Sequence, residues 1–196
     1  MKTLVFRNAD KIVFQTEQVR SYFSKRIQKK GVIIQNMIMT ENNEVHQIRH
    51  KEIVAAGRLD EDKNFQMLIK VFSSISLPCD QLRILGERPY GRQLATLISS
   101  LNMNHKIHLE GQVENVIPYF NGGDIFVITS NHEGMPNVLI EAMATGMACI
   151  SSNFRSGGAS ALIKNGTNGI LIPVNDNNAL KNALFLLAND FELKNK

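Results

Sequence analysis

The sequence is poor in cysteine and contains no long apolar segment. Its two cysteines, Cys79 and Cys149, are too few for a disulfide framework and form no CxxC pair. We therefore expect free thiols in a reducing compartment. No run of about 18 apolar residues occurs, which predicts no transmembrane helix. Residues 1–14 lack a long apolar core after their first charges, so we do not expect a secretion signal.

The sequence also lacks several glycine-rich signatures. The patterns GxGxxG, GxxxxGK[ST] and GxSxG are absent. The absence of the glycine-rich fingerprint argues against a dinucleotide-binding or flavodoxin-like domain. No metal site is predicted, because no histidine has ligand spacing with carboxylates or thiols; the five are His46, His50, His105, His108 and His132. With 196 residues, 43% hydrophobic and 20% charged, the composition indicates a globular chain of one domain, or of one domain and a fragment.

Positive charge is concentrated at the start of the chain. Residues 1–30 hold eight Lys and Arg against Asp10 and Glu17, whereas residues 31–196 carry a small negative excess. A basic leader of this kind can bind nucleic acid or an anionic membrane. The remainder has no electrostatic footprint for nucleic acid, so we expect no nucleic-acid partner.

The leader predicts a strand, a helix and a second strand. Residues 11–16 form a short apolar run, and Thr16 can cap the helix that follows. Three apolar residues at helical spacing predict one stripe on a basic helix that ends at Gly31. The stripe consists of Val19, Phe23 and Ile27. A strand is expected at 32–34, and a polar connector at 40–50.

From residue 52 onward, short apolar runs alternate with amphipathic segments. Strands are expected at 53–56, 82–85, 106–109, 124–129, 148–150 and 169–173. Helices are expected at 65–75, 94–101, 116–120, 136–145 and 178–187. This alternation predicts an α/β fold, a Rossmann-like doubly wound parallel sheet of about six strands. Ligands of such sheets bind at the carboxyl ends of the strands, so the loops there should carry the chemistry.

The loop after the first of these strands carries two cations. Arg58 and Lys63 lie five positions apart, across a turn from strand to helix that begins at Gly57. Converging there, they would suit a diphosphate. The alternative is an ordinary solvated loop, because residues 60–62 are all acidic.

The loop after the fourth strand predicts an anion site at the start of a helix. Gly134 allows a ligand to approach the backbone closely, and Pro136 suits the first turn of a helix. The backbone amides of Met135, Asn137 and Val138 would then point out of the helix N-terminus.

Two carboxylates accompany this helix. Glu133 lies just before it, and Glu141 lies in its second turn within an otherwise apolar stretch. A carboxylate among apolar neighbours needs a polar partner, which sugar hydroxyls would supply. The alternative is that Glu141 faces solvent on an amphipathic helix.

Two segments resemble a known enzyme family. GRLDEDKNFQMLIKVF and, further along, SNHEGMPNVLIEAMATGMACI are similar to the C-terminal domain of family 4 glycosyltransferases, retaining enzymes with the two-domain GT-B fold. Glu133 and Glu141 match the family's E-x7-E motif, and Arg58 and Lys63 match its G-R-L-x-x-x-K-[NG] motif. The resemblance departs from the family at Asn36-Met37, where Asn-Pro is usual.

The resemblance implies a binding site for a nucleoside-diphosphate sugar, with UDP as the expected nucleotide and GDP as the alternative. The loop around Gly57, Arg58 and Lys63 would hold the diphosphate, and the loop containing Gln112 and Val113 would contact the base. Glu141 would accept hydrogen bonds from the ribose. Glu133 would bind the sugar near the reacting carbon, in a catalytic role. The segment after Glu133 would meet the sugar and phosphate through Gly134, Met135, Pro136, Asn137 and Val138.

The resemblance also implies a division of the chain. Residues 1–31 would be the end of an N-terminal domain with its linker, and residues 32–196 would be the donor-binding domain. The acceptor, a saccharide or a lipid-linked glycan, would bind to the missing N-terminal domain. The stripe of the leader would then be left exposed. No metal and no cofactor are expected, and the expected location is the cytoplasm, with peripheral contact to a membrane through the basic leader.

A second interpretation stays open. Because most of the family's first domain is absent from the sequence, the chain could be a non-catalytic subunit that binds a nucleotide sugar and acts only through a partner chain.

Overall fold

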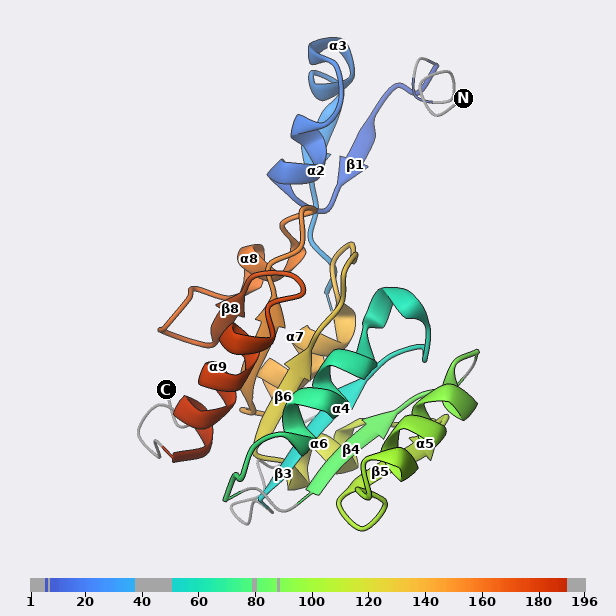
Figure 1. Cartoon of the computed structure of the whole chain (residues 1–196). Helices are drawn as coiled ribbons and strands as arrows, with labels where there is room; N and C mark the ends of the chain where they lie inside the picture. The colour runs from blue at the N-terminus through green and yellow to red at the C-terminus, as the bar shows by residue number, and fades with distance from the viewer. Residues whose placement is uncertain (1–5, 7, 38–50, 79–80, 88, 190–196) are drawn as a thin grey trace.

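The structure, a computed structural model, describes residues 6, 8–37, 51–78, 81–87 and 89–189. A large α/β unit carries at one end a small unit that the leader forms (Figure 1). The connector predicted at 40–50 lies outside the described residues, as does Cys79. Within those residues, no helix combines the length and the apolar character that crossing a bilayer requires.

The large unit is built on a six-stranded sheet. Its strands are β3 (Glu52–Ala56), β4 (Gln81–Leu85), β5 (Ile107–Gly111), β6 (Ile125–Ile128), β7 (Ala148–Ser152) and β8 (Ile170–Ile172). They pair in the order β5-β4-β3-β6-β7-β8, and every pair is parallel. The six predicted strands and the doubly wound parallel sheet are confirmed.

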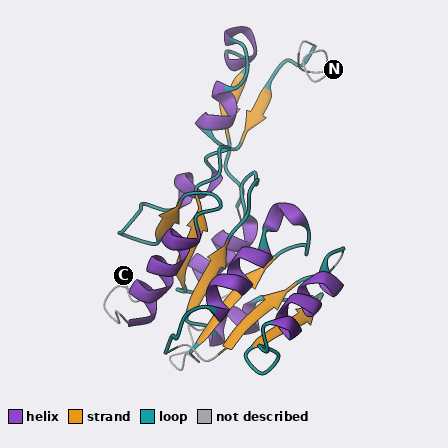
Figure 2. Ribbon diagram, in the orientation of Figure 1, coloured by secondary structure: helices purple, strands orange, loops and turns teal. Residues whose placement is uncertain are grey.

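Helices cover both faces of this sheet (Figure 2). One face packs against α4 (Phe65–Ser73), α5 (Gly91–Ser100) and α9 (Asn177–Asn189). The other face packs against α6 (Ile117–Gly122), α7 (Asn137–Ala144) and α8 (Gly158–Leu162). The five predicted helices form, and a short 3₁₀ helix, η1 (Glu61–Lys63), precedes α4. Helix α8 was not predicted, because its five residues are too few to establish a helical period.

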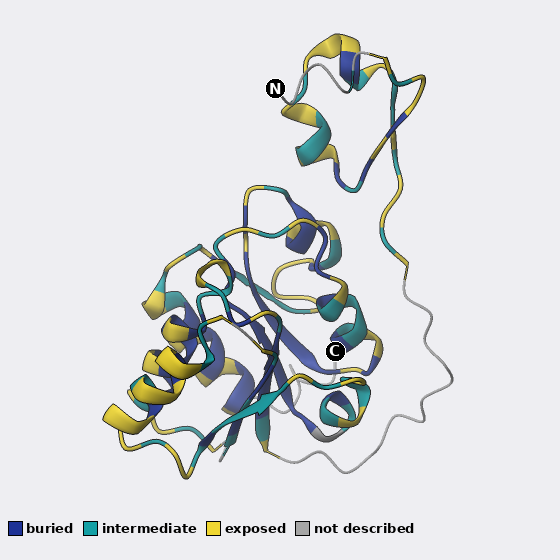
Figure 3. Ribbon diagram, turned by 90° about the vertical axis from the view of Figure 1, so that its right-hand side faces the viewer, coloured by how far each residue is buried: buried dark blue, intermediate teal, exposed yellow. Residues whose placement is uncertain are grey.

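The central strands β3 and β6 are apolar except for Glu52 at the start of β3, because both of their faces are buried (Figure 3). On β3, Ile53 and Ala55 belong to the core beneath α4 and α9, whereas Val54 belongs to the core beneath α6 and α7. Cys149 on β7 lies in the second core as a free thiol. Burial raises the pKa of Cys149 to about 12, so this thiol stays protonated near neutral pH.

The leader folds differently from the single helix that its sequence predicts. Strands β1 (Ile12–Phe14) and β2 (Gly31–Ile33) form a parallel pair, joined through α2 (Glu17–Ser21) and α3 (Lys25–Gln28). The prediction of one helix is wrong because the chain leaves the helical conformation at Ser24, where ψ is 152°. The Gln28 side chain stabilises this break by donating to the Phe23 carbonyl at 2.6 Å. The domain boundary predicted at residue 31 falls at the start of β2, and it stays a prediction.

Contrary to the prediction, the apolar stripe of the leader is not exposed. Ile27 is buried, and Val19 and Phe23 are half-buried. They pack with β1 in a small core of their own. The bend between α2 and α3 makes this possible, because it folds the stripe back onto the strands. The apolar side chains that do remain exposed are others, namely Val13, Tyr22, Val32, Ile34 and Met37.

An arginine joins three adjacent strands of the large sheet. Arg83 on β4 donates to both carboxylate oxygens of Glu52 on β3, each at 2.9 Å, and to Glu110 on β5 at 2.6 Å. The three side chains retain between 16% and 31% of their exposure. The guanidinium therefore compensates two partly buried charges of the same sign.

We expect Arg83→Ala to lower the free energy of unfolding by about 1–3 kcal/mol, because it leaves two partly buried carboxylates without the cation that compensates them. Urea denaturation measures this change. Arg92→Ala on the exposed side of α5 is the control, and it should change stability by no more than about 0.5 kcal/mol. Equal losses in the two variants would contradict the structural role of Arg83.

Candidate functional site

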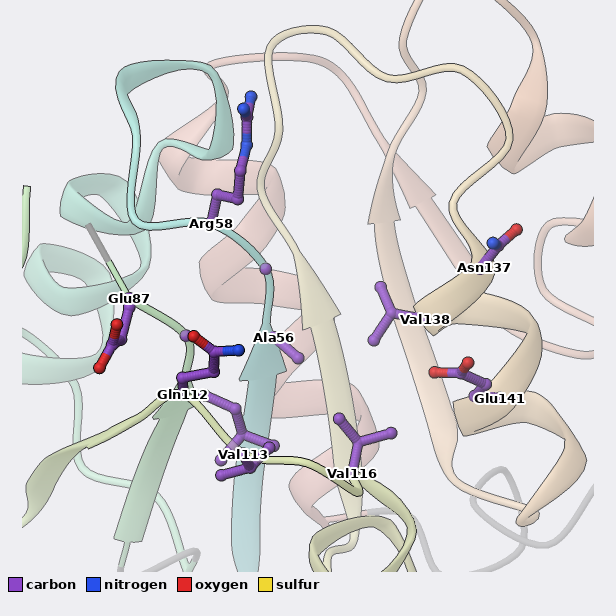
Figure 4. A pocket seen from close by; sticks show the side chains of 12 residues that line it. Ala56, Arg58, Glu87, Gln112, Val113, Val116, Asn137, Val138 and Glu141 are labelled. Atoms are coloured by element: carbon purple, nitrogen blue, oxygen red, sulfur yellow. The ribbon is translucent and has the colours of Figure 1, made fainter. Parts of the chain in front are cut away.

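The strand order of the large sheet reverses between β3 and β6, the two central strands. The chain segments that follow them lead away on opposite faces and leave a crevice, the usual ligand site of such sheets. A cavity of about 460 Å³ opens there (Figure 4). It is lined by Ala56, Gly57, Arg58, Leu85, Gly86, Glu87, Gln112, Val113, Val116, Asn137, Val138 and Glu141.

The cavity brings together seven of the predicted site residues. They are Gly57, Arg58, Gln112, Val113, Asn137, Val138 and Glu141. Five others lie outside its lining, namely Lys63, Glu133, Gly134, Met135 and Pro136. The residues after β4, Gly86 and Glu87, were missed. In the sequence, the glycine that ends this apolar strand could have pointed to them. The structure shows why a glycine is required there, because a β-carbon at Gly86 would come within 1.9 Å of the Gly57 carbonyl oxygen.

The two predicted cations have different partners. Arg58 lies at the rim of the cavity with 81% of its side chain exposed, and its Nη2 is 2.8 Å from Asp60 Oδ2. The Lys63 ammonium forms an ion pair with the Glu133 carboxylate, and each of these side chains is only 18% exposed. Arg58 is therefore open to solvent, whereas Lys63 is held by a residue of the other central loop.

The loops after β3 and β6 are tied together by hydrogen bonds. The buried Thr129 hydroxyl donates to the carbonyls of Lys63 at 3.0 Å and of Asn64 at 3.1 Å. The backbone amide of Asn131 donates to the Asp62 carbonyl at 2.7 Å. These contacts hold the Lys63–Glu133 pair at a fixed place beside the cavity.

The Gly134 carbonyl packs closely against the start of α8. A β-carbon at Gly158, on α8, would come within 1.9 Å of the Gly134 carbonyl oxygen. The Ser156 hydroxyl also donates to that carbonyl at 3.1 Å. The segment before α7 therefore rests against the start of α8.

Helix α7 begins one residue later than predicted. Pro136 has an extended conformation, with ψ of 104°, and is the N-cap residue rather than part of the first turn. No side chain of a described residue caps the helix. Within the described part of the chain, the backbone amides of Met135, Asn137 and Val138 have no acceptor. Free amides at the N-terminus of a helix favour an anion.

Glu141 faces the cavity from the second turn of α7, below Val138 (Figure 4). Among the described residues, none donates a hydrogen bond to its carboxylate. Burial raises the pKa of Glu141 above its ordinary value. A half-buried carboxylate without a partner favours a ligand that supplies hydroxyl or N–H donors.

No cluster of three or more metal-binding side chains occurs within the ranges that the structure covers. His132 is 81% exposed and lies 3.4 Å from an Asp62 carboxylate oxygen. His46 and His50 lie outside the described residues.

A family model described as Glycosyl transferases group 1 matches residues 50–190. An uncharacterized glycosyltransferase of Haemophilus influenzae is 29% identical to this chain over 196 residues, which are 98% of the chain and 55% of that relative. A Campylobacter jejuni enzyme is 32% identical over 171 residues, 85% of the chain and 46% of the enzyme. It is an N-acetylgalactosamine-N,N'-diacetylbacillosaminyl-diphospho-undecaprenol 4-alpha-N-acetylgalactosaminyltransferase. The chain thus spans about half the length of these relatives.

Solved structures of similar fold include Anabaena HepE in complex with UDP-glucose and TarM of S. aureus. HepE has a TM-score of 0.83 at 20% identity, covering 97% of this chain and 57% of HepE. TarM has a TM-score of 0.86 at 22% identity, covering 98% of this chain and 40% of TarM. At these identities the likeness shows the fold, and the expected half of a GT-B structure is confirmed.

Glu141→Gln should make the protein more stable than the wild type at pH 7. The folded state disfavours the ionised carboxylate, so the wild type loses stability as the pH rises from the ordinary glutamate pKa through the raised value. The advantage of the variant should therefore shrink at pH 4. Urea midpoints at both pH values measure it, with Glu114→Gln on the exposed surface as the control. An advantage that is equal at both pH values would contradict the burial of this charge.

Proposed function

Since this chain belongs to the glycosyl transferases group 1 family, we propose that it is the donor-binding part of a glycosyltransferase that uses a nucleoside-diphosphate sugar. UDP is the nucleotide we favour, and the sugar would be transferred with retention of configuration and without a metal ion. Binding of the donor in the cavity between β3 and β6 is the first step of this activity.

One observation carries the proposal: the Glu141 carboxylate faces the cavity with no hydrogen-bond donor from the described residues, near apolar side chains and the open amides at the start of α7. The parts of a nucleoside diphosphate match these surroundings in order. The base would lie against Gly86 and Val113, the ribose hydroxyls would donate to Glu141, and the diphosphate would lie between Arg58 and the start of α7.

The position of the Lys63–Glu133 ion pair beside the cavity supports a role for both residues next to the diphosphate. When the bond between the sugar and the diphosphate breaks, negative charge develops on the leaving group. Arg58, Lys63 and the amides at the start of α7 would stabilise that charge, which is why no metal is needed in this proposal. Glu133 would bind hydroxyls of the donor sugar, close to the reacting carbon.

The acceptor would bind outside this chain. The relatives are about twice as long as the chain, and the name of the Campylobacter jejuni relative specifies a diphospho-undecaprenol acceptor. We infer a saccharide or a lipid-linked glycan as acceptor, held by a second domain. A cytoplasmic protein in peripheral contact with a membrane fits this inference, since Lys25, Arg26 and Lys29 are exposed around α3.

Calorimetric titration of the chain tests the nucleotide. We expect UDP, or failing that GDP, to bind, and NAD and FMN to show no binding, because the cavity has a ribose acceptor and an anion site but no glycine-rich fingerprint. EDTA should leave the affinity unchanged. Binding of only NAD or FMN would overturn the proposal, and loss of UDP binding in EDTA would overturn its metal-free form.

Two variants separate the phosphate from the sugar. Arg58→Ala should weaken UDP and UDP-sugar equally, by about tenfold or more, because it removes a charge-assisted contact to the diphosphate. Glu133→Ala should leave UDP affinity within about twofold and weaken only the UDP-sugar. Titrations of both ligands measure this, with Arg92→Ala as the control.

Unchanged affinities in Arg58→Ala would mean that this arginine does not bind phosphate. Equal losses for UDP and UDP-sugar in Glu133→Ala would refute its role at the sugar.

A further inference from the structure

Three side-chain amides connect the leader to the start of helix α7. Gln15, after β1, donates through Nε2 to Asn36 Oδ1 at 2.7 Å. Asn36, after β2, donates through Nδ2 to Asn137 Oδ1 at 2.6 Å. Asn137 is the first residue of α7 and lines the cavity. Asn36 and Asn137 are 101 positions apart in the sequence, so only the fold brings them together.

These hydrogen bonds determine which way each amide is turned. A carboxamide has an accepting oxygen on one side and a donating nitrogen on the other. Because Gln15 donates to the Asn36 oxygen, the Asn36 nitrogen is turned to Asn137. The oxygen of Asn137 is thereby engaged, and its nitrogen is directed to the side of the cavity (Figure 4).

The orientation of Asn137 matters for what the cavity can bind. Its side-chain nitrogen joins the backbone amides of Asn137 and Val138, which have no acceptor among the described residues, so three hydrogen-bond donors gather at this corner. A reversed carboxamide would instead present an oxygen to an anionic ligand and repel it. The hydrogen-bonded side-chain amides of Gln15, Asn36 and Asn137 therefore favour ligands that carry phosphate or sugar oxygens at this point.

Further contacts hold the leader next to the start of α7. The Thr16 hydroxyl donates to the Ser156 carbonyl, and the Tyr22 hydroxyl donates to the Arg155 carbonyl at 2.9 Å. The Gln15 oxygen lies 3.3 Å from the position that a β-carbon would occupy at Gly134. The leader thus packs against the loops on both sides of the α7 N-terminus.

We propose that Gln15 and Asn36 are positioning residues that orient the Asn137 carboxamide as a hydrogen-bond donor to the oxygens of the nucleotide-sugar donor. The proposal rests on the proposed function of the cavity. Both residues lie outside the part of the chain that the family model matches, residues 50–190. Because binding and orientation are linked, an occupied cavity would in turn strengthen the contact between the leader and α7.

Titration of UDP into a set of variants tests this proposal. Asn137→Ala and Asn36→Ala should each weaken UDP binding by about three- to tenfold, the range expected for one hydrogen bond. The double variant should bind no more weakly than Asn137→Ala, because Asn36 acts through Asn137. Asn36→Gln, which keeps a donor, should restore part of the loss. Gln93→Ala, an exposed amide on α5, is the matched control.

A second measurement needs no ligand. In NMR spectra of the free chain, the side-chain amide signals of Asn137, identified by their loss in Asn137→Ala, should shift in Asn36→Ala and stay in place in Gln93→Ala. Unmoved signals would overturn the amide chain, whatever the cavity binds.

The outcomes separate the two proposals. If the wild type binds UDP and Asn36→Ala binds it equally well, the positioning role is wrong and the proposed function stands. If Asn36→Ala and Asn137→Ala have additive effects, Asn36 acts independently and the positioning role is likewise wrong. If the wild type binds none of the nucleotides, the proposed function fails and the positioning role fails with it.

Discussion

The reversal of strand order between β3 and β6 is the constraint on which the rest of the site depends. Both strands are parallel and end at the same edge, so Lys63 and Glu133, 70 positions apart, become neighbours. The crossover helices then lead away on opposite faces, and the space between them stays open as the cavity. The buried Thr129 hydroxyl, just after β6, keeps the two loops together by donating to the carbonyls of Lys63 and Asn64, which follow β3.

The ion pair between Lys63 and Glu133 places two charges beside the cavity that the proposed donor site would use. Each side chain is mostly withdrawn from solvent, so each charge needs a partner when no ligand is bound. Their attraction satisfies this need inside the protein, while Arg58 remains solvated at the rim. The cavity therefore has one preorganised charge pair at its side and, at its rim, one solvent-exposed cation whose internal partner is Asp60.

Much of the fold could be predicted, because strands such as β6 are buried on both faces and so carry unbroken apolar runs. The leader was harder to predict. Val19, Phe23 and Ile27 do have helical spacing, but the break at Ser24 depends on a bond from Gln28 and on packing against Ile12 and Phe14. A periodic pattern reports which side chains share a face; it does not report where tertiary contacts bend the backbone.

By itself, the sequence determined the parallel α/β sheet, the two loops that flank the cavity and the placement of Glu141 in an apolar helix. These follow from local patterns of residue type that act over a few positions. The tertiary structure alone decided that Lys63 pairs with Glu133, that Glu87 reaches the cavity and that Asn36 meets Asn137. Each of these contacts joins residues on separate elements, and their distances depend on how the strands are ordered and how the leader packs, which no local pattern encodes.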